Sequence, residues 1–221
     1  MKVYTRSLPF VFCTFVLALL CCAVPADALT NVVIFQTSFE SPALTNQAVE
    51  GVGGLKVIGI NGWSREDTYT YIWNENNTNI TGRVPTPYGE QYAAIWSESG
   101  IVTTNITDRL QPGVTYSLTF NAGNANTESG APMNSINYLA ELLAGTNVLT
   151  SVSFPTASND FSVNGVLTYT PDGTNAYLGE IIGIRFAHTS TDWQYYMLID
   201  NVKLEADESV SEWGTTLFLG E

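Results

Sequence analysis

Hydrophobic and polar residues alternate with a period of two along most of the chain. Strand-like runs of this kind occur at residues 32–35, 69–73, 92–96, 116–120, 161–169, 181–187 and 196–204. Proline and glycine turns separate the runs, for example at Pro112-Gly113 and at Pro171-Asp172-Gly173. Short strands with turn signals at intervals of about ten residues are typical of an all-β sandwich or barrel.

Only the segment 136–154 also suits a helix, because Leu139–Ala144 contains good helix formers. The turn residues Gly145-Thr146-Asn147 follow directly, and Val148–Phe154 is rich in residues that favour strands. We therefore predict a β-hairpin here, with its turn at Gly145-Thr146-Asn147.

The N-terminal segment has the three-part layout of a secretory signal peptide. Lys2 and Arg6 provide a positive start, and Phe10–Ala23 is an apolar run that is short for a membrane span. Ala26-Asp27-Ala28 then provides the small-x-small pattern that a signal peptidase cleaves. We predict cleavage after Ala28 and a secreted protein, located extracellularly or on the cell surface.

This cleavage would remove every cysteine of the chain: Cys13, Cys21 and Cys22. The mature protein would then have neither disulfides nor thiolate metal ligands. The chain carries 21 acidic and 8 basic side chains, for a formal net charge of −13. This charge repels phosphate backbones and anionic lipids, so we expect no nucleic-acid partner and no membrane insertion.

We divide the chain into three parts. Residues 1–28 are the signal peptide, residues 29–206 form one β-sandwich domain, and residues 207–221 form an acidic and apolar C-terminal tail. The tail contains Trp213 and Leu217-Phe218-Leu219 without an evident partner in the domain, so it is a possible contact for a protein partner.

Three segments carry a family resemblance. They are Ser38-Phe39-Glu40 followed by Gly62-Trp63, then Gln111–Phe120, and finally Leu198–Leu204. In this order they resemble the galactose-binding-like jelly roll of many carbohydrate-binding modules, a pattern also found in secreted bacterial proteins with C-terminal sorting signals. The resemblance covers most of residues 31–206 and implies a jelly-roll β-sandwich of two antiparallel sheets.

The same resemblance implies a structural calcium that ties the first strand to the last, with Glu40 and Asp200 as its ligands. Two carboxylates brought together repel each other unless a proton or a cation neutralises them. Hard oxygen ligands favour calcium. The alternative is that both carboxylates are solvated or accept hydrogen bonds from backbone N–H groups.

Aromatic side chains beside polar groups are the candidates for a sugar site, because aromatic rings stack on the apolar faces of sugars. Any one of them can instead belong to the core, to which we assign Trp63. The candidate ligand-binding residues are Trp193, Tyr195, Gln194, Tyr71, Trp73, Tyr88, Trp96 and His188.

From these observations we expect a non-catalytic carbohydrate-binding module with carbohydrate or polysaccharide as its partner. One alternative is a structural or adhesive surface protein without a sugar site. Another is a glycan-cleaving jelly-roll enzyme, which would require paired carboxylates in a cleft or a tyrosine that faces His188.

Overall fold

The computed structural model describes residues 30–41, 55–56, 62–66, 69–74, 84–126, 136–156, 161–191 and 195–208. The predicted signal peptide, Trp193, Gln194 and the tail from residue 209 onward lie outside the described residues.

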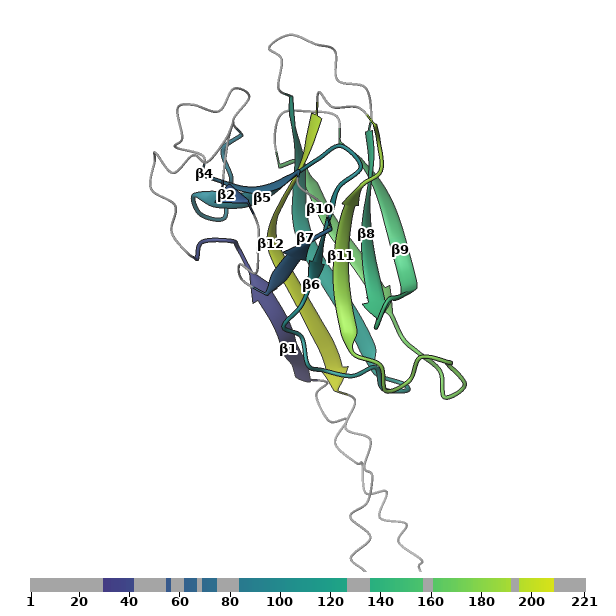
Figure 1. Cartoon of the computed structure of the whole chain (residues 1–221). Helices are drawn as coiled ribbons and strands as arrows, with labels where there is room; N and C mark the ends of the chain where they lie inside the picture. Colours follow the sequence, from purple (N-terminus) through teal and green to yellow (C-terminus); the bar gives the residue numbers. More distant parts are fainter. Residues whose placement is uncertain are drawn as a thin grey trace, which may run out of the picture.

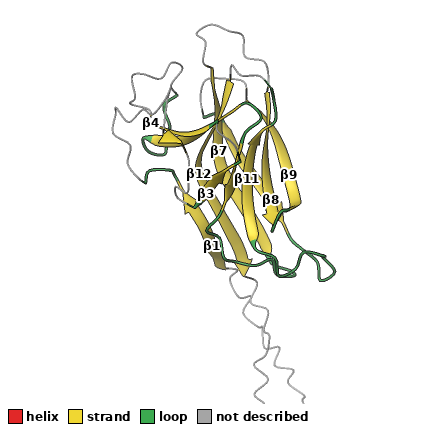
Figure 2. Ribbon diagram, in the orientation of Figure 1, coloured by secondary structure: helices red, strands yellow, loops and turns green. Residues whose placement is uncertain are grey.

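The described part consists of strands joined by loops and turns, without a helix (Figure 2). It accordingly contains no helix that could cross a membrane. In chain order the strands are β1 (Thr30–Thr37), β2 (Leu55–Lys56), β3 (Trp63–Arg65), β4 (Thr70–Asn74), β5 (Gln91–Trp96), β6 (Gly100–Thr103), β7 (Thr115–Asn126), β8 (Ile136–Ala144), β9 (Asn147–Thr156), β10 (Val163–Tyr169), β11 (Ile182–His188) and β12 (Tyr195–Glu208).

Two antiparallel sheets face each other (Figure 1). The seven-stranded sheet has the order β10-β7-β12-β5-β4-β2, and β1 also pairs with β12. The five-stranded sheet has the order β3-β6-β11-β8-β9. This arrangement confirms the predicted fold class, an all-β jelly-roll sandwich of two antiparallel sheets. The predicted hairpin is confirmed as well, because β8 pairs with β9 and Gly145 in the turn has a φ of 58°.

Strand β12 changes its partner on one side partway along its length. Its residues 196–199 pair with β5, whereas residues 202–208 pair with β1. Its register against β7 shifts between Asp200 and Lys203, and Asn201 has a φ of 47°. Asp200 therefore lies at the irregular point where β12 leaves β5 and joins β1.

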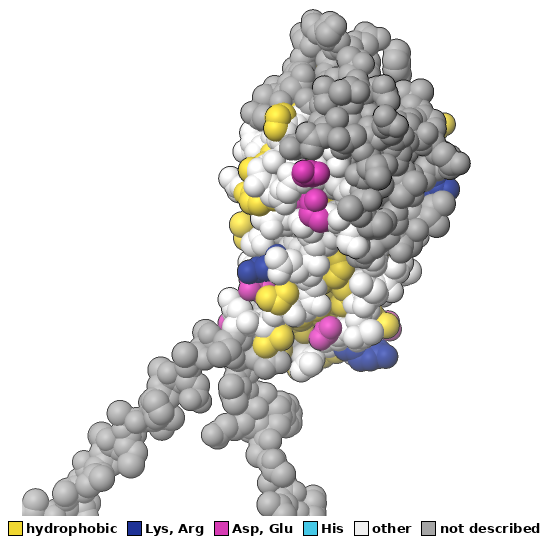
Figure 3. Space-filling model, turned by 90° about the vertical axis from the view of Figure 1, so that its left-hand side faces the viewer, with side chains coloured by type: hydrophobic (Ala, Val, Ile, Leu, Met, Phe, Trp, Pro, Cys, Tyr) yellow, Lys and Arg dark blue, Asp and Glu magenta, His cyan; other side chains and the backbone are white. Residues whose placement is uncertain are grey.

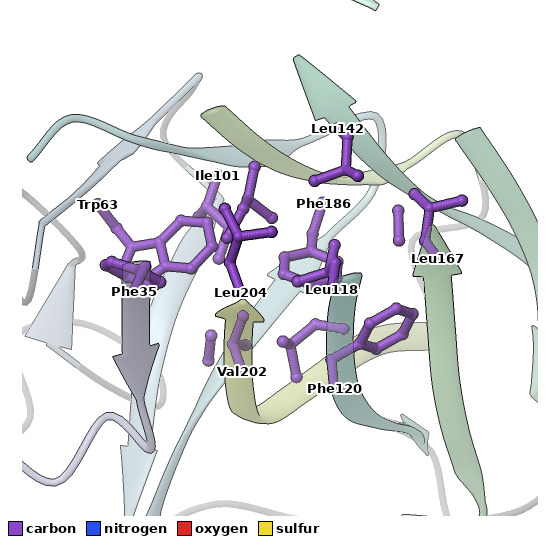
Figure 4. Close-up of a cluster of buried hydrophobic side chains, with 14 of the residues drawn as sticks. Phe35, Trp63, Ile101, Leu118, Phe120, Leu142, Leu167, Phe186, Val202 and Leu204 are labelled. Carbon is purple, nitrogen blue, oxygen red and sulfur yellow. The ribbon is translucent and has the colours of Figure 1, made fainter. Parts of the chain in front are cut away.

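The core fills the space between the sheets (Figure 4). Phe120 and Phe186, from opposite sheets, meet with ring centroids 5.0 Å apart. Trp63 is fully buried beside Phe35 and Phe186, which confirms its assignment to the core. The Phe120 ring also lies over Gly165 of β10, where an added Cβ would come within 2.1 Å of it. Because the sequence places large apolar residues at alternate strand positions, this face of each sheet is closed by packing alone.

Candidate functional site

A second hydrophobic cluster lies on the face of the seven-stranded sheet that is turned away from the five-stranded sheet. We call this face the outer face. On β12, Met197 and Ile199 join the core, whereas Tyr196 and Leu198 belong to the second cluster. We call the following residues the aromatic cluster: Tyr71, Trp73, Val84, Tyr92, Ala94, Trp96, Ala125, Phe161, Tyr196 and Leu198.

The strand register arranges the outer face in rows that run across the strands. The middle row contains Gly123, Leu198, Ala94 and Tyr71 on β7, β12, β5 and β4. Small residues thus lie on both sides of Leu198, and larger rings lie in the rows beside them. Because Ala94 is small, rings from the neighbouring rows can approach each other above it.

Tyr196 is the centre of the ring contacts in the aromatic cluster. Its ring is stacked on Trp96 at a centroid distance of 5.6 Å and lies 4.5 Å from the ring of Trp73. Tyr71 contacts the same ring edge-on at 6.4 Å. Offset and edge-to-face contacts of this kind hold the aromatic rings of the cluster in fixed orientations.

The polar groups of the aromatic cluster are neutral. The Tyr92 hydroxyl accepts a hydrogen bond from the backbone N–H of Val84 at 3.5 Å. Burial raises the pKa of Tyr196 to about 12, and Tyr71 adds to this effect, so the Tyr196 phenol keeps its proton at neutral pH. The cluster includes no acidic or basic residue. The members of the cluster themselves therefore carry no charge at neutral pH.

Asp200 lies on the outer face next to the aromatic cluster and is fully buried. It is paired with Asn121, which donates to Asn164 at 2.5 Å and accepts from Asn201 at 3.0 Å. The pKa of Asp200 is raised to about 7, mainly by burial and to a smaller extent by Glu40, while hydrogen bonds from Thr86 and the Asn201 backbone oppose the shift. The backbone N–H of Tyr88 orients the Thr86 hydroxyl that binds Asp200.

Glu40 follows β1 and meets the start of β5. Its Oε1 accepts the backbone N–H groups of Glu90 and Gln91, both at 2.9 Å. The Gln91 side chain donates in return to the backbone oxygen of Phe39 at 2.6 Å. At Gly89, with a φ of 139°, an added Cβ would lie 2.1 Å from Glu40 Oε1. The chain therefore needs glycine at this position to admit the carboxylate.

The residues around Glu40 and Asp200 fit a hard cation. Both provide carboxylate oxygens, and neither takes part in a salt bridge with a described residue. A hollow of about 560 Å³ beside Glu40, lined mainly by the end of β1, gives access from the surface. The side chains of His, Cys, Asp and Glu in the described residues form no group of three or more that could hold a metal. Any cation here would therefore need backbone, hydroxyl or water oxygens as further ligands.

The structure separates the sequence-predicted aromatic candidates. Tyr71, Trp73 and Trp96 come together in the aromatic cluster, although Trp73 is only 3% exposed. Tyr88 lies outside the cluster and is 38% exposed. Tyr195 belongs to the core between the sheets.

His188 is also buried, and its ring centroid lies 5.0 Å from that of Tyr138. Trp193 and Gln194 lie outside the described residues.

The candidate list omitted three aromatic members of the cluster: Tyr92, Phe161 and Tyr196. The sequence does contain a sign of the position of Tyr196. It lies an even number of residues from Asp200 along the same strand, so both side chains lie on one face, whereas Tyr195 lies on the opposite face. Phe161 precedes β10, and its contact with Tyr92 at 5.2 Å joins segments far apart in the sequence. No local pattern indicates that contact.

The comparisons with solved structures show the same fold in cyclases. A cyclase from Fischerella sp. TAU has 23% sequence identity and a TM-score of 0.63, covering 80% of this chain and 98% of that one. A second structure from that organism, in complex with 4-(1H-indol-3-yl)butan-2-one, has 24% identity and a TM-score of 0.63, covering 79% and 97%.

A third, the Stig cyclase Fisc in complex with (3Z)-3-(1-methyl-2-pyrrolidinylidene)-3H-indole, has 22% identity and a TM-score of 0.62, covering 80% and 98%. No curated protein matches the chain.

The family comparison corrects the functional expectation from the sequence. Residues 30–205 match the HpiC1-like family, described as HpiC1 cyclase. A non-catalytic carbohydrate-binding module is therefore wrong, and so is a carbohydrate or polysaccharide as its partner. The resemblance to carbohydrate-binding jelly rolls identified the sandwich, but a shared sandwich does not bring its sugar site with it. The chain belongs to the HpiC1-like family of cyclases.

Proposed function

We propose that this protein is a cyclase that binds an indole-bearing substrate on the aromatic cluster and closes a ring in it. The observation that carries the proposal is the burial of stacked Trp and Tyr rings on the outer face, which the sandwich core does not require. Related cyclases in complex with indole compounds support the choice of substrate class.

The chemistry follows from the neutral, apolar character of the aromatic cluster. Stacking on Tyr196 and Trp96 would hold a flat ring in one orientation, which brings the ends of its side chain close together. Aromatic faces also stabilise positive charge that develops during ring closure. Exclusion of water by the surrounding apolar residues would protect such a charge from hydrolysis.

Binding of 4-(1H-indol-3-yl)butan-2-one tests the site by isothermal titration calorimetry. We expect saturable binding that Tyr196→Ala weakens at least tenfold, about the loss of one aromatic contact. Tyr88→Ala is the matched control, since Tyr88 is exposed and outside the cluster. No binding by the unmodified protein, or equal losses in both variants, would contradict the proposed site.

Ring closure itself is tested with a panel of indoles that carry unsaturated side chains. Closure within one molecule conserves its formula, so we expect a product of unchanged mass and altered retention in liquid chromatography–mass spectrometry. Tyr196→Ala should lower its rate of formation. Products in the same amounts without protein would contradict enzymatic cyclisation.

We also propose that Glu40 and Asp200 hold a structural calcium. The bound ion would neutralise a buried carboxylate at the point where β12 changes its partner, and would join β1, β5 and β12. At calcium about 100-fold above its Kd, we expect a rise in melting temperature of about 5–10 °C over the protein in chelator.

Glu40→Gln is the control for calcium, because its amide oxygen can still accept the two backbone hydrogen bonds while the negative charge is lost. This variant should melt at the same temperature with and without calcium. Identical melting curves of the unmodified protein in chelator and in calcium would refute the site.

Finally, we propose that the protein is secreted after cleavage behind Ala28, on the strength of the N-terminal sequence pattern. N-terminal sequencing of protein from the culture medium should begin at Leu29. Protein found only inside cells with an intact N-terminus would contradict secretion.

A further inference from the structure

Trp73 carries a buried polar group inside the aromatic cluster. Its side chain is on the outer face of β4, where the residue is 3% exposed. The ring centroid lies 4.5 Å from that of Tyr196 and 6.2 Å from that of Tyr92. These two contacts fix the indole ring, and with it the direction of its N–H group.

The Nε1–H of Trp73 has no hydrogen-bond acceptor in the described part of the protein. A buried donor normally has a partner, because burial without one carries the full cost of removing the group from water. A missing partner is not sufficient evidence of a ligand, since Trp63 in the core has the same unpartnered Nε1–H. The difference is the location: Trp63 is enclosed by Phe35, Phe39 and Phe186, whereas Trp73 belongs to the surface proposed to bind substrate.

The character of the cluster limits what could accept this hydrogen bond. Its members include no basic residue, so an anionic ligand group would lie there without a countercharge. An uncharged acceptor, such as a carbonyl oxygen or the nitrogen of a nitrile or imine, needs only one donor. Such an acceptor would satisfy the Trp73 N–H without bringing a charge into the cluster.

We propose that Trp73 Nε1–H donates a hydrogen bond to an uncharged acceptor atom of the substrate and thereby selects aromatic substrates that carry one. The inference rests on the proposed function of the aromatic cluster. Stacking alone would not distinguish between rings with different substituents. The Trp73 hydrogen bond would favour those substrates whose substituent carries an acceptor atom.

Two ligands that differ only in the acceptor provide the test: the indolyl ketone probe used above and 3-butylindole, which lacks its carbonyl group. Calorimetry avoids the change in fluorescence that loss of a tryptophan causes. We expect Trp73→Phe to weaken binding of the ketone by about 5- to 30-fold, the loss typical of one buried hydrogen bond. Binding of 3-butylindole should weaken less than about threefold, because the phenyl ring still stacks.

Trp63→Phe is the matched control, with the same substitution and the same unpartnered N–H in the core. It should leave the ratio of the two affinities unchanged. An equal loss for both ligands in Trp73→Phe would show that Trp73 acts only as an apolar wall, which overturns the inference while leaving the binding site intact. If the unmodified protein binds neither ligand, the proposed function fails and this inference fails with it.

Discussion

Each face of the seven-stranded sheet carries a buried cluster of side chains, and the two clusters differ in chemistry. On the inner face, aliphatic and phenyl groups such as Leu118 and Phe120 of β7 pack against the five-stranded sheet, and the buried Tyr116 hydroxyl is hydrogen-bonded to the backbone of Arg109 and Gln111. On the outer face, Trp73, Tyr92 and Tyr196 carry N–H and O–H groups on their rings. The main task of the inner face is to exclude water, which aliphatic and phenyl groups do at the lowest cost.

Polar groups on aromatic rings can orient a bound ligand by hydrogen bonding. Without a hydrogen-bond partner, a buried polar group lowers the stability of the protein. We therefore expect substitutions on the inner face to change mainly the free energy of unfolding, and those on the outer face to change mainly binding. Substituting residues on one face at a time tests whether stability and binding depend on different faces.

The largest effect is expected on the inner face, for Phe120→Ala. The Phe120 ring contacts Phe154 at 5.3 Å and Phe186 at 5.0 Å, and it fills the space over Gly165. Its removal should lower the free energy of unfolding by about 3–5 kcal/mol, through lost burial and the cavity that remains. Urea denaturation measures this loss. Below the transition, the variant should bind the ketone probe with an affinity close to that of the unmodified protein, and a large loss of affinity would break the division of roles.

An intermediate loss of stability is expected for Arg185→Met on the outer face of the five-stranded sheet. This face carries an ion-pair network of charged side chains. Arg185 contacts Glu66 and Glu141, each at 2.8 Å, and these contacts hold the pKa of the guanidinium well above its usual range. The Glu141 side chain is only 8% exposed, so Arg185→Met would leave a buried carboxylate without its partner. We expect a loss of about 2 kcal/mol, less than for a fully buried pair because Arg185 is partly exposed.

Lys203→Met is the control for Arg185→Met. Lys203 pairs with Glu205 at 2.8 Å, but both side chains retain more contact with solvent than Glu141 does. This variant should lie within about 0.5 kcal/mol of the unmodified protein in the same denaturation experiment. Equal stability losses in the two variants would show that burial of Glu141 has no special consequence.

The sequence was sufficient to predict the sandwich because the patterns that indicate strands and turns lie within short segments of the chain. Alternation indicated the strands, and the turn at 145–147 decided between helix and hairpin. The segment Leu198–Leu204 was placed correctly in the last strand. Each of these inferences uses residues within a few positions of one another, where backbone geometry and side-chain period determine the outcome.

The candidate site was less accessible to sequence reasoning because it is built across strands. Trp73 and Tyr196 lie far apart in the chain, and their contact depends on β4 and β12 both pairing with β5. Composition also misled, since exposed aromatics beside polar loops suggest a sugar site, whereas these rings are buried together. The candidate list contained Tyr195, which lies in the core, but not its neighbour Tyr196, which lies in the aromatic cluster.

The smallest effect at neutral pH is expected for Tyr196→Phe on the outer face. The Tyr196 hydroxyl makes no hydrogen bond with the described residues, so its removal should change stability by less than about 0.5 kcal/mol at pH 7. At higher pH the variant should become the more stable protein. The pKa of Tyr196 is raised to about 12, so the unfolded chain loses this proton first, and the unmodified protein is destabilised as the pH rises from 10 to 12.

At pH 11 the difference in favour of Tyr196→Phe should reach about 1 kcal/mol in urea denaturation. Tyr116→Phe sharpens the contrast, because burial also raises the pKa of Tyr116 while its hydroxyl bonds Arg109 and Gln111. That variant should already lose about 1 kcal/mol at pH 7. If both variants behave alike at pH 7, the Tyr196 hydroxyl has a structural partner, and the outer face is built for stability in the same way as the inner one.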